Sequence, residues 1–288
     1  MIKITTLNNH VKYCYFYVIG TKIRKNSYNK GFLGGFMIPA ERQKLLLNLI
    51  SQKGVISISK LVESLNVSHM TVRRDIQKLE KMGSVISVSG GVKIGEHLSF
   101  EPTHQDKSLL FHDQKEKIGE MAAQFIPNNT TIYLDAGTTT LEIAYRIIER
   151  DDLLVITNDF SIAQFLMTNG KCELIHIGGT VNKQNYSSVG ELAGQFLHQL
   201  SIDISFVSTS SWTLKGLTTP DENKLPVKKA LIASSNQLIL VSDSSKYGKV
   251  ATFHICPLTH FDHIICDKNL VESAQNTIKE LKIDLITV

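Results

Sequence analysis

The stretch Val67–Leu79 (VSHMTVRRDIQKL) decides the fold of the first part of this chain. Ser68 can accept hydrogen bonds from the free amides of a first helical turn, and Val67 precedes it in the position of a hydrophobic staple. Three aliphatic residues then follow at helical spacing and predict one buried stripe: Val72, Ile76 and Leu79. With the capping serine, the outer face would carry side chains that read bases or bind phosphates: Ser68, His69, Thr71, Arg73, Arg74, Gln77 and Lys78.

This pattern also fits an ordinary amphipathic helix with a solvated basic face, so the neighbouring segments decide between the two interpretations. The segments Ala40–Gln52 and Ser59–Leu65 each carry an apolar face at helical spacing, and Asn66 stands in a tight turn before the cap. Downstream, Val85–Ile94 (VISVSGGVKI) alternates around a glycine pair, which predicts a β-hairpin. Three helices and a hairpin predict a winged helix-turn-helix domain over residues 37–95.

The recognition segment resembles that of the DeoR family of bacterial transcription regulators. The family segment reads S, two residues, T, an aliphatic residue, RRD and a leucine-bearing tail, and the residues that match it in register are Ser68, Thr71, Val72, Arg73, Arg74, Asp75, Leu79 and Glu80. The family hairpin usually carries an arginine and then a histidine before its two glycines, whereas this chain has Ser87 and Ser89. The resemblance implies that the domain binds double-stranded operator DNA.

Length and composition bound the remaining possibilities. With 288 residues, 42% of them hydrophobic, the chain can form one small and one larger globular domain. The apolar run Val11–Ile19 contains a lysine, is too short to span a bilayer and lacks a small-residue cleavage site, so we expect a cytoplasmic protein with no membrane partner. The four cysteines have no paired spacing, and the His and Cys residues between His254 and Cys266 fit no standard zinc pattern. We expect neither a metal site nor a cofactor.

Charge is divided unevenly along the chain. Residues 1–36 contain six basic and no acidic residues, and residues 37–95 contain nine basic against four acidic. Because the whole chain carries +4, residues 96–288 carry −7. A basic N-terminal part followed by an acidic C-terminal part predicts that only the N-terminal part binds DNA. We interpret residues 1–36 as an extension before a normal start at Met37, or as a basic arm that adds non-specific DNA affinity.

The second part of the chain alternates between short apolar runs and helical stretches. Lys93–Leu110 is polar and predicts a connection between domains, and Asp113–Phe125 predicts a helix. The β-branched runs are TIYLD, LLVIT, ELIHI, ISFVST, LILVS and HIICD, with helical spacing between them. This alternation predicts an α/β domain over residues 96–288, with a mostly parallel sheet covered on both faces.

Small polar segments follow five of these runs: Asp135–Thr140, Thr157–Asn158, Gly178–Thr180, Ser208–Ser211 and Asp243–Lys246. Ligands of such folds bind outside the carboxyl ends of the strands, so these segments predict one pocket. Gly137, Thr138 and Thr139 would hold a phosphate at a helix start, with Lys246 as a compensating charge. Asp135 and Asn158 could bind sugar hydroxyl groups.

This part is similar to the effector domain of the DeoR family, which itself resembles sugar-phosphate isomerases. The residues that match in order are Asp135, Gly137, Thr138, Thr139, Thr157, Asn158, Gly178, Gly179, Asp243, Ser244, Ser245 and Lys246. The resemblance implies that this set contains the effector-binding residues. Asp221–Lys229 departs from the family's more acidic run before its lysine, and we expect Pro226 to alter which ligand the pocket recognises.

Two functions from different classes fit these patterns. The first is a transcription regulator, a repressor of a carbohydrate catabolic operon that acts as a homodimer or higher oligomer and responds to a phosphorylated sugar or sugar acid. The second is a sugar-phosphate isomerase or deaminase that carries a DNA-binding head. An enzyme of that kind needs a carboxylate or histidine base beside the sugar carbons. Asp135 is a candidate base, whereas His176 alternates within ELIHI as a strand side chain, so the sequence favours the regulator.

Overall fold

The computed structural model describes residues 37–88 and 90–288. The extension over residues 1–36 therefore lies outside the described residues, as does Ser89 of the expected hairpin. Among the described helices, none is both long enough and apolar enough to cross a membrane.

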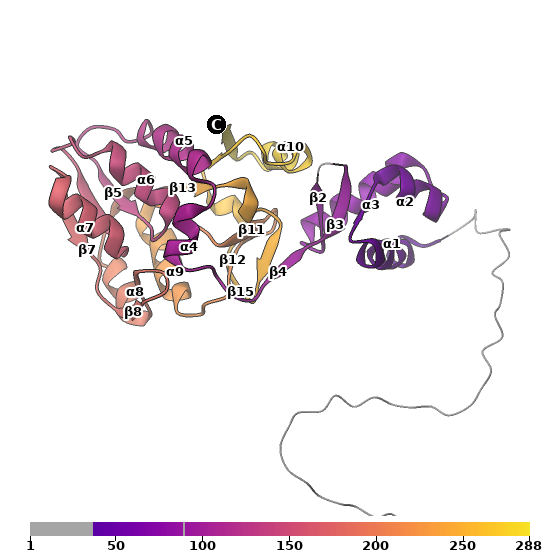
Figure 1. Ribbon diagram of the computed structural model, residues 1–288, viewed down its shortest axis with the longest axis horizontal. Coiled ribbons are helices and arrows are strands. Elements are labelled where there is room, and N and C mark those ends of the chain that lie inside the picture. Colours follow the sequence, from indigo (N-terminus) through magenta and orange to yellow (C-terminus); the bar gives the residue numbers. More distant parts are fainter. Residues whose placement is uncertain (1–36, 89) are drawn as a thin grey trace, which may run out of the picture. The chain divides into compact units, whose positions relative to one another are not determined.

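The expected winged helix-turn-helix is present (Figure 1). Its helices are α1 (Pro39–Lys53), α2 (Ile58–Leu65) and α3 (His69–Lys81), and its antiparallel sheet has the order β1 (Val55–Ile56), β3 (Gly91–Ile94), β2 (Val85–Val88). Ser68 caps α3 by accepting a hydrogen bond from the Thr71 amide, and Asn66 adopts a left-handed conformation in the turn. The stripe of α3 is buried with residues of α1, α2 and the sheet. The sequence thus predicted this domain, except for β1.

The larger domain is built on a seven-stranded sheet in which every neighbouring pair is parallel. Its strand order is β17 (Asp284–Thr287), β16 (His263–Cys266), β13 (Ser235–Ser242), β10 (Ile202–Val207), β5 (Thr131–Leu134), β6 (Leu154–Thr157), β7 (Glu173–His176). The six apolar runs identified in the sequence all form strands of this sheet, and β17 is a seventh that they did not include. The predicted α/β class with a parallel sheet is confirmed.

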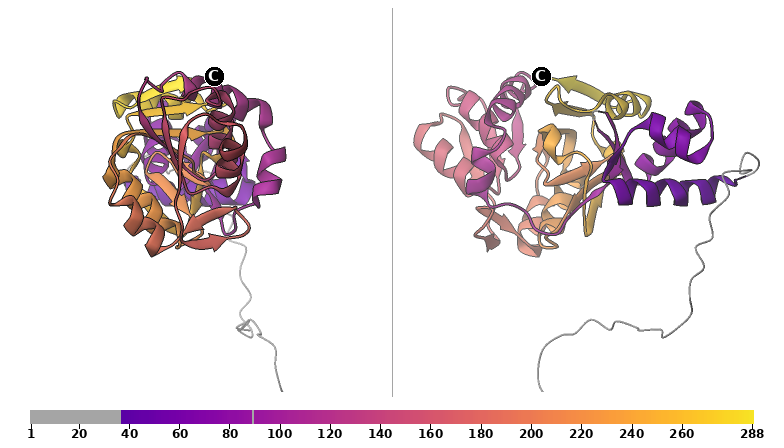
Figure 2. Two further views of the ribbon diagram at one scale, coloured as in Figure 1. Left: turned by 90° about the vertical axis from the view of Figure 1, so that its left-hand side faces the viewer. Right: turned by 45° about the vertical axis from the view of Figure 1, so that its right-hand side comes forward.

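Helices cover both faces of the sheet (Figures 1 and 2). One face is covered by α5 (His112–Ala123), α6 (Thr138–Arg146) and α7 (Phe160–Asn169), and the other by α8 (Glu191–Leu197), α9 (Lys224–Ser234) and α10 (Glu272–Glu280). Successive strand residues serve opposite faces, since Ile132 and Leu134 pack with the first set and Tyr133 with the second. Burial on both faces explains why the strands read as continuous apolar runs.

Smaller elements surround the carboxyl edge of the sheet. They are the pair β4 (Glu96–Leu98) with β14 (Lys249–Ala251), α4 (His104–Leu109), the hairpin β8 (Thr180–Asn182) with β9 (Ser187–Val189), the 3-10 turn η1 (Ser244–Lys246), and the antiparallel sheet β11 (Ser211–Thr213), β12 (Gly216–Thr219), β15 (Phe253–Cys256). The segment expected to be a plain connection, Lys93–Leu110, therefore contains a strand and a helix. Its helix begins at a capping box formed by Thr103 and Asp106.

Candidate functional site

A cavity lies outside the carboxyl ends of β5, β6, β10 and β13. The space between its lining atoms is about 700 Å³, a volume that includes the open mouth of the cavity. Asp135, Asn158, Ser208 and Asp243 each follow one of these strands and line the cavity. Four of the five polar segments identified in the sequence thus contribute to one site.

The start of α6 forms one wall of the cavity through Gly137, Thr138 and Thr139. Asn158 and Asp159 position this turn, because the Asn158 Oδ1 atom accepts from the Ala136 amide at 3.0 Å and the Asp159 Oδ2 atom accepts from the Gly137 amide at 3.1 Å. First-turn amides of a helix have no partner within the helix, and the helix dipole favours an anion there. This wall therefore suits a phosphate or carboxylate group.

Asp135 is held from several sides at the end of β5. Its Oδ2 atom accepts from the Ser208 amide at 2.9 Å and from the Lys228 ammonium group, with which it forms an ion pair between two buried side chains. Lys228 also donates to the Ser208 carbonyl oxygen at 2.6 Å. The Asp135 carboxylate is therefore a fixed and charge-compensated group of the cavity wall.

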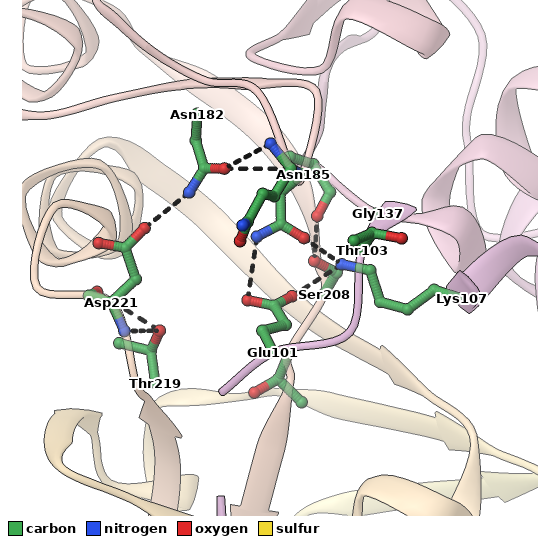
Figure 3. Close-up of polar contacts among 12 residues, drawn as sticks. Glu101, Thr103, Lys107, Gly137, Asn182, Asn185, Ser208, Thr219 and Asp221 are labelled. Atoms are coloured by element: carbon green, nitrogen blue, oxygen red, sulfur yellow. Dashed lines mark hydrogen bonds and ion pairs between the residues drawn. The ribbon is translucent and has the colours of Figure 1, made fainter. Parts of the chain in front are cut away.

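Glu101 enters the cavity from the segment between β4 and α4. Its carboxylate lies 2.7 Å from Lys107 of α4, and the Asn185 amide donates to it at 3.4 Å (Figure 3). Lys224, at the start of α9, forms a second ion pair with the same carboxylate. The Glu101 side chain is only 9% exposed. Burial alone would raise the pKa of this carboxyl group, but Lys224 and Lys107 outweigh burial and hold the pKa at about 2.

Two further lysines face the cavity, Lys115 of α5 and Lys246 of η1. Lys115 donates to the Leu110 carbonyl oxygen at 2.6 Å. Burial lowers the pKa of Lys115 to about 8, because the nearby Asp243 carboxylate offsets only part of that effect. Altogether five lysines and three acidic residues line the cavity: Lys107, Lys115, Lys224, Lys228 and Lys246, with Glu101, Asp135 and Asp243. The cavity therefore carries two more positive than negative groups inside a domain that is acidic as a whole.

The structure brings together most of the effector-binding residues expected from the sequence. Asp135, Gly137, Thr138, Thr139, Asn158 and Lys246 line the cavity. The other three expected residues, Thr157, Gly178 and Gly179, are not among the described residues that line the cavity. Thr157 is buried and donates to the Leu134 carbonyl oxygen at 2.7 Å, which ties β6 to β5. The role of all nine residues in effector binding stays a prediction.

Sequence reasoning did not identify Glu101 or four of the five lysines. Glu101, Lys107 and Lys115 lie in or just beyond the segment that the sequence assigned to a connection between domains. Charged residues are common in such segments, so these three did not indicate a binding site. Lys224 and Lys228 are spaced i, i+4 and so share one face of a helix, a signal that was available. His176 is a strand residue as expected, and its ring lies 4.6 Å from that of Phe160.

The residues expected to contact DNA lie on the free side of α3. His69, Arg73, Arg74 and Lys78 are exposed, Thr71 is half-buried, and Ser68 is exposed at the cap. Asp75 and Glu80, which belong to the same motif, point inward instead and are buried. Which of these exposed side chains contacts a DNA base stays a prediction.

Comparisons with known proteins agree with both domains. The family model described as the DeoR-like helix-turn-helix domain matches residues 42–97, and that of the DeoR C terminal sensor domain matches residues 110–268. An HTH-type transcriptional regulator of Haemophilus influenzae is 65% identical over 88% of this chain and 98% of its own length. The HTH-type transcriptional regulator YgbI of Escherichia coli is 47% identical over 87% of this chain and 98% of its length.

The glycerol-3-phosphate regulon repressor of Escherichia coli is a more distant relative, 28% identical over 80% of this chain and 92% of its own length. These relatives are named as regulators or repressors and not as enzymes. With both family models matched in order and two relatives aligned along nearly their whole length, the chain belongs to the DeoR family of DNA-binding transcription regulators.

Proposed function

We propose that this regulator represses a carbohydrate catabolic operon and that a phosphorylated sugar or sugar acid, bound in the cavity, lowers its affinity for operator DNA. In this proposal residues 37–95 bind the DNA and residues 96–288 bind the effector. The observation that carries it is the concentration of five lysines around the start of α6, at the carboxyl edge of a parallel sheet.

The cavity supports an anionic ligand with hydroxyl groups. Its excess of two positive groups and the first-turn amides of α6 favour a phosphate or carboxylate group. Side-chain hydroxyl groups between these charges, such as those of Thr138 and Thr139, can bind the hydroxyl groups of a sugar. The name of the distant relative, a glycerol-3-phosphate regulon repressor, is consistent with a phosphorylated small molecule and with repression.

The exposed face of α3 supports binding in the major groove of DNA. In winged helix-turn-helix proteins the second helix of the motif reads base edges, and each domain contacts one half-site. Half-sites recur at about 34 Å or multiples of it, so we expect at least a dimer on the operator. An effector needs a coupling free energy of only about 1–3 kcal/mol between the two sites to release such a complex.

An isomerase or deaminase activity has less support from this cavity. A base that removes a proton from a sugar carbon must be free to accept it. Asp135, the candidate base, already accepts from Lys228 and Ser208, and the relatives are named as regulators.

The test is a gel shift of the purified protein on the DNA upstream of its own gene, at fixed salt, titrated with phosphorylated sugars and sugar acids. We expect specific binding that one of these compounds releases. Specific binding that no compound changes would contradict the effector proposal. Turnover of a compound without specific DNA binding would favour the enzyme instead.

A further inference from the structure

The site around Glu101 has the composition of an anion-binding site that is filled by the protein itself. Lys107 and Lys224 converge on one carboxylate, and their side chains are only 11% and 15% exposed. Asn185 completes the site, because its Nδ2 atom donates to Glu101 and its Oδ1 atom accepts from Lys107 at 2.7 Å (Figure 3). Two nearly buried ammonium groups require a negative partner, so only another anion can take the place of Glu101.

Glu101 lies in the segment that joins the wing of the DNA-binding domain to the sheet domain. Glu101 follows β4, which pairs with β14, and lies seven residues after Ile94, the last residue of the wing strand β3. It also lines the same cavity as the start of α6. A carboxylate attached by a short chain acts at a high effective concentration, and it competes with any free anion for the two lysines.

We propose that Lys107 and Lys224 form a second anion subsite of the effector cavity, that Glu101 is its tethered occupant, and that an effector carrying two anionic groups displaces Glu101. This inference rests on the proposed function for the nature of the effector. One anionic group of the ligand binds at the start of α6, and the other, a phosphate or a carboxylate, replaces Glu101. Displacement frees the segment that joins the wing to the sheet domain, and so the same event that fills the cavity changes the attachment of the DNA-binding domain.

The experiment compares full-length wild type with Glu101→Gln and with the control Glu96→Gln, which removes an exposed carboxylate on β4 in the same segment. Inorganic phosphate is the first probe, because it needs neither DNA nor a known effector. Thermal unfolding midpoints are measured with rising phosphate, with ionic strength held constant by chloride. We expect E101Q to unfold at a lower temperature in chloride, because both lysines lose their partner, and phosphate to restore its midpoint. Wild type and E96Q should respond much less.

Titration calorimetry then gives the affinities. We expect E101Q to bind phosphate at least about tenfold more tightly than wild type, within the range of known couplings between sites. An equal phosphate response in E101Q and wild type would overturn the subsite, since a merely structural ion pair predicts lower stability without any gain in anion binding. If E101Q does not fold, Glu101→Asp weakens the contact and keeps the charge, and should raise phosphate affinity by a smaller factor.

Two further arms separate this inference from the proposed function. Gluconate carries a carboxylate, glucose 6-phosphate a phosphate, and 6-phosphogluconate both. We expect the gain in affinity of E101Q over wild type to be largest for the compounds whose anionic group binds to Lys107 and Lys224. Operator affinity without ligand should fall several-fold in E101Q and stay unchanged in E96Q. Unchanged operator affinity in E101Q would overturn the link to DNA binding. Failure of every phosphorylated compound to release wild type from its operator would contradict the proposed function and leave the phosphate result standing.

Discussion

Arg42 on α1 and Asp75 on α3 form a largely buried ion pair, with 2.5 Å between the Nε and Oδ2 atoms. Gln43 adds a hydrogen bond to the Asp75 Oδ1 atom at 2.9 Å. The residues of the RRD motif therefore have two different roles. Arg73 and Arg74 are exposed, whereas the buried Asp75 holds the recognition helix against α1. Positioning by a buried pair is sensitive to the loss of either partner.

We expect Asp75→Ala to destabilise the winged helix domain by about 3 kcal/mol, because it removes the carboxylate that pairs with the largely buried Arg42 guanidinium group and leaves that group a hydrogen bond to the Met37 carbonyl oxygen. Urea unfolding, followed by a probe in the first domain, measures this change. The control is Glu96→Ala, which removes a 3.8 Å pair between exposed side chains and should cost no more than about 1 kcal/mol. Similar losses in both variants would contradict a special role for Asp75.

The second prediction concerns base reading by α3. Arg74→Ala should weaken operator binding by about 1–3 kcal/mol, as expected when an arginine that bonds a guanine is lost, and should leave binding to random DNA nearly unchanged. Gel shifts on operator and random duplexes at the same salt measure the two affinities. Lys117→Ala removes one exposed positive charge from α5 and serves as the control. Equal weakening on both duplexes would make Arg74 a phosphate contact.

A third variant separates effector binding from DNA binding. Lys246→Ala removes a cavity lysine in η1 and should leave operator affinity intact. The effector concentration needed for release should rise at least about tenfold, because a hydrogen bond to a charged group contributes about 1.5–3 kcal/mol. Lys229→Ala, at an exposed position of α9, is the matched control. Loss of DNA binding in K246A would show that Lys246 supports the fold rather than the ligand.

Local patterns accounted for most of the fold. The cap and periodicity of α3 are set by residues within one helix, and each strand of the parallel sheet reads as an apolar run because both of its faces are buried. By contrast, β1 has only two residues, too few for a period. Its presence explains Gly91, where a Cβ atom would lie 2.4 Å from the Ile56 carbonyl oxygen. The sequence showed a glycine pair and predicted only the turn.

The candidate site was predictable only where strand ends determine it. Asp135 and Lys246 could be placed because each follows a strand of one parallel sheet, and such ends meet at one edge. Glu101 could not be placed, since its partner Lys224 is 123 residues away in the chain and the two meet only through the tertiary fold. The segment that carries Glu101 has no hydrophobic period that would have indicated a site.

The last prediction is a pH dependence centred on Asp159, which lies between the cavity wall and α7. Its carboxylate caps α7 by accepting from the Ser161 and Ile162 amides at 2.7 and 2.9 Å, and it also accepts from Gly137. Burial raises the pKa of Asp159 to about 6, an effect that these amide hydrogen bonds only partly oppose and that the charge of Asp135 adds to.

The direction of the effect follows from proton linkage. The unfolded chain has the ordinary value of 3.8 for this group, so between about pH 4 and pH 6 the folded protein binds the proton and the unfolded chain does not. The stability that this proton provides is present in full below about pH 4 and is lost as the pH rises through 6. A shift of this size corresponds to at most about 3 kcal/mol. Asp159→Asn, which still caps a helix well, cannot titrate.

We therefore expect the free energy of unfolding of D159N, relative to wild type, to increase by about 1–3 kcal/mol between pH 4.5 and pH 7. Urea unfolding of both proteins across this range measures the difference, and other titrating groups cancel because they are common to both. Parallel curves would mean that Asp159 is already charged throughout. With a pKa of about 6, Asp159 is mostly ionised at pH 7 in either case, so an anion at the start of α6 depends on the lysines of the cavity to offset this charge.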